Sequence, residues 1–183
     1  MTTTETLTSA PGSTWQLDPV HSTVGFEVDY LAGTFRGTFR DVQATLDVED
    51  GAGRLEGSAK VESVDVKDEN LAAHLQSPGF FDAERHPELR FSAEDVSLDG
   101  VTVTIEGDLT MKGITERVEI AGTATAPITD AYGKQRLGLK VSTTVDRTRF
   151  GLDWNMPLPT GRPALANEVT IVGELQFVQA DAS

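Results

Sequence analysis

Hydrophobic and polar residues alternate with a period of two along most of the chain. Val103, Ile105, Leu109 and Met111 share one parity with Val101, whereas threonines and charged residues occupy the other. This alternation predicts strands with one buried and one wet face, the pattern of antiparallel sheets. Rows of the same kind occur at residues 24–30, 55–61, 118–124, 137–145 and 169–177.

Two segments depart from simple alternation. Inward residues are odd-numbered over 35–39 and even-numbered over 42–48, which predicts a bulge in a long strand. Asp68 is placed to cap a short helix that Pro78-Gly79 would end. About eight strands and one helix favour an antiparallel sandwich or a closed barrel. We expect one domain over residues 14–179, with flexible tails at 1–13 and 180–183.

The inward rows contain many small residues, which leaves two interpretations open. Glycines inside strands permit curvature, so large neighbours would fill the interior; alternatively, they leave a dry cavity for an apolar ligand. A long proline-rich segment, residues 151–166, is either a lid over that cavity or a loop packed on the barrel end. The small inward residues are Gly25, Gly37, Gly57, Ala59, Ser63, Gly107, Gly122, Ala124 and Gly173.

Charge and composition exclude several classes of function. The formal net charge is −14, so nucleic acid and anionic lipid surfaces repel the chain overall. Without cysteine there is no disulfide framework and no thiolate chemistry. The first thirteen residues hold neither a basic nor an apolar run, and no later stretch is long enough to span a membrane, which predicts a cytoplasmic location.

Candidate chemistry is sparse. The three histidines lack the spacing of helix-borne metal ligands, and the sequence holds no nucleophile elbow, Walker loop or dinucleotide fingerprint, so we expect no metal, no cofactor and no catalytic residue. His21 fits a turn residue, and His74 is either a satisfied interior histidine or a contact for a ligand headgroup. Arg147 and Arg149 would suit an anionic or quinone head, or an ion pair with the abundant acids.

Several segments resemble the YceI-like proteins, a polyisoprenoid-binding, lipocalin-like bacterial family. The resemblance runs in order from Trp15 to Phe177, nearly the whole chain, and its most specific part is the helix and loop that follow His74. The matching segments are residues 15–26 (WQLDPVHSTVGF), 35–39 (FRGTF), 74–82 (HLQSPGFFD) with His86-Pro87 and Phe91-Ser92, 107–115 (GDLTMKGIT) and 147–152 (RTRFGL).

The resemblance implies an all-β fold, an extended antiparallel eight-stranded barrel with one short helix between strands. It also implies that the interior holds a polyisoprenoid, an isoprenoid quinone or another long amphiphile, for carriage, storage or stress response, without catalysis. A homodimer is left open. The residues expected to bind the ligand are Phe26, Phe35, Phe39, Leu109, Val141 and Phe177 along the cavity, and His74, Phe80, Phe81, Arg147 and Trp154 near its mouth.

Two rival functions follow from other features of the sequence. An enzyme acting on a lipophilic substrate would use His21 or His74 as a base, and it would need a carboxylate or hydroxyl beside that imidazole. An interaction or stress module would act through the acidic exterior, with the barrel as a passive scaffold.

Overall fold

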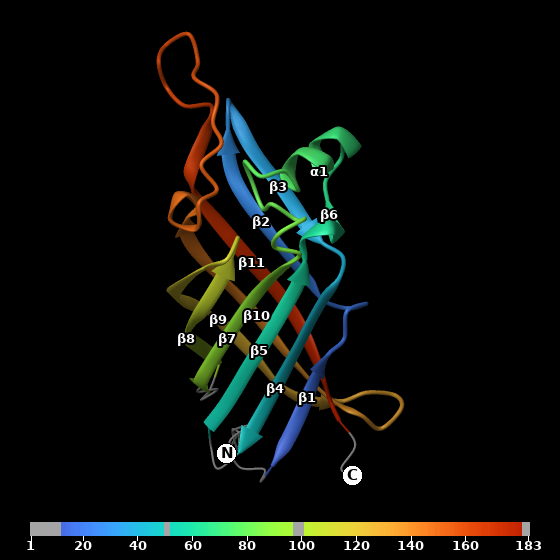
Figure 1. Ribbon diagram of the computed structural model, residues 1–183. Coiled ribbons are helices and arrows are strands. Elements are labelled where there is room, and N and C mark those ends of the chain that lie inside the picture. Colours follow the sequence, from blue (N-terminus) through green and yellow to red (C-terminus); the bar gives the residue numbers. More distant parts are fainter. Residues whose placement is uncertain (1–11, 50–51, 97–100, 181–183) are drawn as a thin grey trace.

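The computed structural model describes residues 12–49, 52–96 and 101–180 (Figure 1). Strands dominate it, with one α-helix, α1 (Glu69–Leu75), and two short 3-10 helices, η2 (Val61–Ser63) and η3 (Arg147–Phe150). The strands are β1 (Ser13–Leu17), β2 (Thr23–Tyr30), β3 (Gly33–Phe39), β4 (Val42–Glu49), β5 (Ala52–Lys60), β6 (Val64–Asp65), β7 (Glu88–Val96), β8 (Thr102–Met111), β9 (Ile114–Thr129), β10 (Gln135–Asp146) and β11 (Leu165–Gln179).

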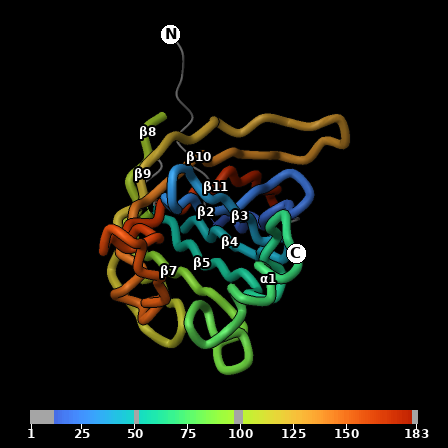
Figure 2. The backbone as a smooth tube through the Cα atoms, turned by 90° about the horizontal axis from the view of Figure 1, so that it is seen from above, coloured from blue at the N-terminus to red at the C-terminus, as the bar shows by residue number. Residues whose placement is uncertain are grey.

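The sheet closes into an eight-stranded antiparallel barrel, as expected. Its order is β1-β4-β5-β7-β8-β9-β10-β11, and β11 returns to β1 through the pairs Trp15–Gln179 and Leu17–Phe177. Seen from above, α1 lies at the edge of the barrel, on the side opposite β8 and β9 (Figure 2). Strands β2, β3 and β6 prolong the wall toward the upper end in Figure 1, because β2 pairs with the first part of β11.

The predicted bulge is wrong, because the parity change marks a break between two strands. β3 ends at Phe39 and β4 begins at Val42, and the intervening Arg40 and Asp41 bond elsewhere. The Arg40 amide donates to the carbonyl of Ser63, and the Asp41 carbonyl accepts from Lys60. The chain therefore changes partners between β2 and β5, and the parity of its inward side chains shifts with it.

The single helix begins where the sequence indicates. The Asp68 side chain accepts a hydrogen bond from the Leu71 amide at 3.0 Å, which satisfies one of the free N–H groups of the first turn. The helix ends at Leu75, which is buried against the upper barrel. Because α1 lies over the upper end of the barrel, it positions the loop that follows it, residues 76–87 (Figure 1).

Two apolar clusters divide the interior. The lower one, here called the floor cluster, includes Trp15, Leu46, Val103 and Phe177, none of which is more than 3% exposed. The upper cluster surrounds Phe26 and includes residues of α1 and of the segment after β10. Only the lower half of the barrel is therefore densely filled, and the upper half holds the space described below.

The ends of the domain differ slightly from expectation. Ser13, assigned to a tail, is buried in β1, and the Ala180 amide donates to the carbonyl of Thr14. The predicted tails at 1–11 and 181–183 lie outside the described residues. Val101, expected in a buried row, is 68% exposed just before β8. In the part of the chain described, no helix is long and apolar enough to cross a bilayer.

Candidate functional site

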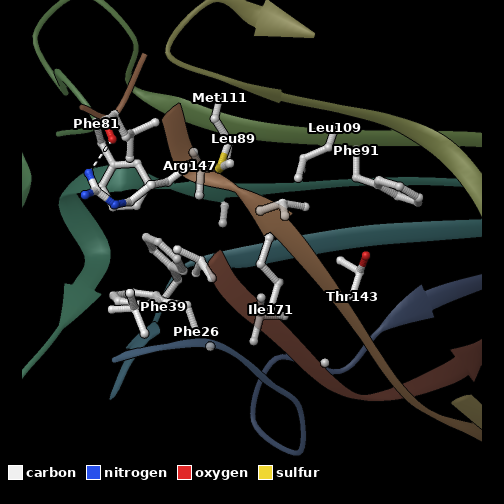
Figure 3. Close-up of a pocket in the computed structure, with 18 of the residues that line it drawn as sticks. Phe26, Phe39, Phe81, Leu89, Phe91, Leu109, Met111, Thr143, Arg147 and Ile171 are labelled. Atoms are coloured by element: carbon white, nitrogen blue, oxygen red, sulfur yellow. Dashed lines mark hydrogen bonds between the residues drawn. The ribbon is translucent and has the colours of Figure 1, made fainter. Parts of the chain in front are cut away.

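A cavity of about 630 Å³ occupies the upper half of the barrel (Figure 3). It reaches from the floor cluster to α1 and to residues 151–166, here called the mouth loop. Its volume falls within the range of about 300–1,000 Å³ that is typical of sites for small organic ligands. The barrel is therefore neither an empty pore nor a filled core.

The cavity wall is almost entirely apolar. Alternate residues of the strands point inward, so β2, β3, β7, β8, β10 and β11 each contribute aliphatic or aromatic side chains. The side chains labelled in Figure 3 converge on the same space from these strands, from the loop after α1 and from η3. The apolar wall includes Phe26, Val28, Phe35, Phe39, Phe81, Leu89, Phe91, Leu109, Met111, Val118, Val141, Val145, Val169 and Ile171.

The floor cluster closes the cavity from below. Phe177 is fully buried there, between the partner strands that carry Leu17 and Leu137, and Trp15 donates from Nε1 to the Ser13 hydroxyl at 3.1 Å. The partly buried Phe91, Val141 and Leu175 pack on this cluster and also line the cavity. The cavity is therefore blind at its lower end.

Both interpretations of the inward glycines hold, at different positions. A β-carbon on Gly107 would lie 2.5 Å from the Phe91 ring, and one on Gly122 would lie 1.8 Å from the Lys140 carbonyl, so these glycines permit close packing. A β-carbon on Gly57 or Gly173 would meet only ordinary contacts, at 3.5 and 3.4 Å, and both residues line the cavity. Of these two pairs, only the second leaves space within the cavity.

One side of the upper wall is a cluster of four phenylalanines. The ring of Phe26 lies 5.9 to 6.4 Å, between centroids, from those of Phe35, Phe39 and Phe81. Phe81 reaches the cluster from the loop after α1, where its amide donates to the carbonyl of Leu75 at 3.0 Å. Aromatic pairs at such distances add stability beyond their buried area, so this wall is well ordered.

A second aromatic group lies at the cavity mouth. The imidazole of His74 on α1 stands edge-on to the rings of Phe80 and Trp154, with centroids 5.0 and 5.1 Å away. Phe80 and Trp154 are 5.2 Å apart. Because Trp154 belongs to the mouth loop, this group joins α1 to that loop across the opening.

Arg147 fixes the mouth loop from below. Its side chain is buried, and the guanidinium donates to the main-chain carbonyls of Leu152, Trp154 and Ala166. Burial lowers its pKa from the ordinary value of arginine. Further N–H contacts reach Leu165 and the side chain of Asn167, at 3.4 and 3.5 Å. The predicted cation at the mouth is therefore a structural clamp whose donors are engaged by the protein.

The mouth loop combines the two roles that the sequence left open. Leu152 and Leu165 are buried against the barrel end, and both line the cavity together with Trp154 and the exposed Met156. Lys112, in the turn between β8 and β9, adds a bond from its ammonium to the Gly151 carbonyl and another to that of Pro78. The loop is thus packed on the barrel and also forms one lip of the opening.

The histidines differ in their surroundings. His21 lies outside the cavity wall, exposed, with Nδ1 2.7 Å from the carboxylate of Asp18. His74 lines the cavity, and the ring contacts described for it are aromatic. Among residues 12–49, 52–96 and 101–180, no group of three or more His, Asp or Glu side chains is arranged to hold a metal.

The structure brings together all but one of the residues predicted from the sequence. Phe26, Phe35, Phe39, His74, Phe80, Phe81, Leu109, Val141, Arg147 and Trp154 all line the cavity. Phe177 was predicted to line it too, but the residue lies in the floor cluster instead. The Phe177 side chain points into the barrel as expected, but it lies lower along the barrel than the cavity.

Some lining residues were not singled out from the sequence. Val169, Ile171 and Met111 belong to inward rows whose parity already indicated them, and Leu89 follows the predicted loop after the helix. Met156 had no signal beyond its place in the mouth loop. Ligand contact by any of these residues remains a prediction.

Comparison with known proteins gives a consistent match. A family model described as the YceI-like domain matches residues 15–177. A UPF0312 protein of Staphylococcus epidermidis is 31% identical over 172 residues, which cover 89% of this chain and 96% of the relative. Among solved structures, BcnA of Burkholderia cenocepacia has a TM-score of 0.75 at 21% identity, covering 87% of this chain and 98% of BcnA. A polyisoprenoid-binding domain from Saccharophagus degradans has a TM-score of 0.67 at 10% identity, covering 91% and 98%.

Proposed function

The chain belongs to the YceI-like family, and from this premise we propose that it binds a long-chain amphiphilic lipid in the barrel cavity, for carriage or storage. The ligand class is a polyisoprenoid, an isoprenoid quinone or a comparable fatty amphiphile. The name of the Saccharophagus degradans domain, which describes polyisoprenoid binding, supports this class.

The blind apolar cavity is the observation on which the proposal rests. Burying a hydrocarbon chain against such walls contributes roughly 25 cal/mol per Å² of apolar surface. Ordering a flexible chain offsets part of this gain. A cavity that is closed below by apolar side chains favours a ligand that enters tail first, since only an apolar end is stable against the floor cluster.

The polar head of the ligand belongs at the mouth. Two polar groups of the wall are already engaged: the Thr143 hydroxyl donates to the Glu119 carbonyl at 2.8 Å, and Arg147 donates to loop carbonyls. A head buried beside them would lose its hydrogen bonds to water without replacement, which is costly. At the mouth, next to His74 and Trp154, a head keeps its contact with solvent.

The test is direct detection of a bound chain. The purified full chain is examined by native mass spectrometry before and after solvent extraction, and the extracted protein is titrated with the fluorescent fatty acid cis-parinarate. We expect one lipid per chain before extraction, and saturable probe binding that geranylgeraniol displaces and hexanol does not. A protein that carries no lipid and binds no probe would overturn the proposal.

A further inference from the structure

Two protrusions meet at the upper end of the barrel beside the cavity mouth. One is the turn between β2 and β3, with Leu31 at its tip, and the other is the outer part of the mouth loop (Figure 1). The Leu31 amide donates to the carbonyl of Ala164 at 3.0 Å, and the Ala164 amide donates to the carbonyl of Met156 at 2.9 Å. The main chains of Leu31 and Met156 are therefore both hydrogen-bonded to Ala164, and the two residues lie at the same edge of the cavity mouth.

This edge exposes large apolar side chains. Leu31 is 61% exposed and Met156 is 51% exposed. Met156 also lines the cavity, so the exposed apolar surface at the edge is continuous with the cavity wall. Leu31 has a φ of +53°, a conformation that non-glycine residues rarely adopt. A strained and exposed leucine adds little to folding, and its side chain is available for a contact outside the fold.

The charge at this edge differs from that of the chain as a whole. The formal net charge is −14, yet residues 154–163 (WNMPLPTGRP) contain no acid and one cation, Arg162, which is exposed. The tip at residues 30–34 is uncharged. The nearest acids in sequence, Asp29 and Asp153, flank these segments, and Asp29 accepts a hydrogen bond from the Thr34 hydroxyl.

From these observations we propose that the mouth rim, defined as Leu31, Met156 and Arg162, docks on the interface of a phospholipid bilayer. Aliphatic side chains beside a single cation suit the boundary between headgroups and acyl chains. The acidic remainder of the surface disfavours any other approach to a membrane. This inference rests on the proposed function, because docking there would place the cavity opening against the lipid from which a chain is taken.

Flotation with vesicles tests the docking. The full chain is mixed with vesicles of phosphatidylcholine, alone or with phosphatidylglycerol, and the floated fraction is measured. The test variant is Leu31→Asn with Arg162→Gln, two rim residues that do not line the cavity. Asparagine tolerates the positive φ, so the change at Leu31 removes the apolar side chain without adding backbone strain. We expect the wild type to float and the variant to bind at least about tenfold more weakly, from the apolar area and the cation lost.

The matched control is Tyr132→Ser with Val20→Ser. These residues are 91% and 84% exposed and lie in turns away from the mouth, so their apolar side chains are equally accessible. We expect this control to float like the wild type. Equal flotation of the rim variant and the wild type, or no flotation of the wild type, would overturn the inference. A wild-type dimer in sedimentation that the rim variant loses, without vesicle binding, would assign the rim to a second copy and overturn it too.

Probe binding separates this inference from the proposed function. The rim variant should bind cis-parinarate in buffer like the wild type but should not float. A variant with a narrowed cavity, Ala44→Leu, should float but bind the probe weakly, because Ala44 lines the cavity away from the rim. A wild-type chain that floats but binds no probe would therefore count against the cavity, and one that binds the probe but does not float would count against the rim.

Discussion

The guanidinium of Arg147 donates a hydrogen bond to the main-chain carbonyl of Trp154, with 2.9 Å between Nη1 and the oxygen. The same group reaches the carbonyls of Leu152 and Ala166, near the two ends of the mouth loop. Because Trp154 lines the cavity, the clamp formed by Arg147 sets the shape of the opening. The buried Arg147 side chain therefore acts on the opening through the main chain to which it is hydrogen-bonded.

Replacing Arg147 with methionine should destabilise the protein strongly. The substitution leaves several loop carbonyls without a charged donor, and each such bond contributes about 1.5–3 kcal/mol. We expect the free energy of unfolding in urea to fall by about 3 kcal/mol or more. The matched control is Arg149→Met, at an exposed position two residues on, where the change should stay within about 0.5 kcal/mol. Equal losses in the two variants would contradict the clamp.

The stability of the barrel should fall in acid through Asp18. Hydrogen bonds from Arg136 and His21 lower the pKa of the Asp18 carboxyl from its usual 3.8 to about 2. A carboxyl with a depressed pKa in the folded state stabilises the protein above its unfolded pKa, and this contribution disappears as pH falls through the folded pKa. The loss should therefore occur between about pH 4 and pH 2.

Asp18→Asn isolates that contribution. We expect the variant to lose on the order of 1–2 kcal/mol at pH 7 and to show a flatter stability curve between pH 4 and pH 2, measured by urea unfolding. Asp47→Asn is the control, since Asp47 is exposed and accepts its hydrogen bond from Thr14. If both variants keep the wild-type acid profile, Asp18 is not the group responsible.

Alternation and capping predicted the strands, the helix and most of the cavity wall, whereas the choice of a barrel over a sandwich came from the family resemblance. Strand parity decides which side chains point inward, so Phe26, Leu109 and Val141 could be assigned from local sequence alone. Parity does not give the height of a residue along the barrel. Phe177 lies in the floor because β11 pairs there with β1 and β10, and these are non-local pairings.

The glycines show the same limit. Whether an inward glycine opens space depends on what the neighbouring strand places opposite it. Gly107 is covered by the Phe91 ring from β7, whereas Gly57 faces Ala44 on β4 and leaves room. The strained Leu31 was likewise not foreseen, because no local pattern predicts a leucine with positive φ.

The two tryptophans should report ligand binding differently. Trp154 lines the cavity mouth, whereas Trp15 is buried in the floor cluster and does not line the cavity. Bound lipid would exclude water from Trp154, so a Trp15→Phe variant should show a blue shift of its emission on adding geranylgeraniol. A Trp154→Phe variant should show little change, because Trp15 is only 3% exposed before binding. The opposite pattern would place the ligand elsewhere.

Narrowing the cavity should weaken lipid binding without weakening the fold. Ala44 and Gly57 face each other across β4 and β5, both line the cavity, and a β-carbon on Gly57 meets nothing closer than 3.5 Å. Leucine at either position would displace at least two methylenes of a bound chain. At about 0.8 kcal/mol for each, affinity for cis-parinarate should fall about tenfold.

Two further variants make this result specific to the cavity. Ala121→Leu adds the same volume on the exposed face of β9, so probe affinity and stability should stay at wild-type values. Gly53→Ala should do the reverse of the cavity variants: its new methyl group would lie only 3.2 Å from the Val96 carbonyl and 3.4 Å from the Leu46 side chain, and this crowding costs stability. Since Gly53, Val96 and Leu46 do not line the cavity, the folded protein should bind the probe normally. Unchanged affinity in both Ala44→Leu and Gly57→Leu would mean that the chain does not occupy this space.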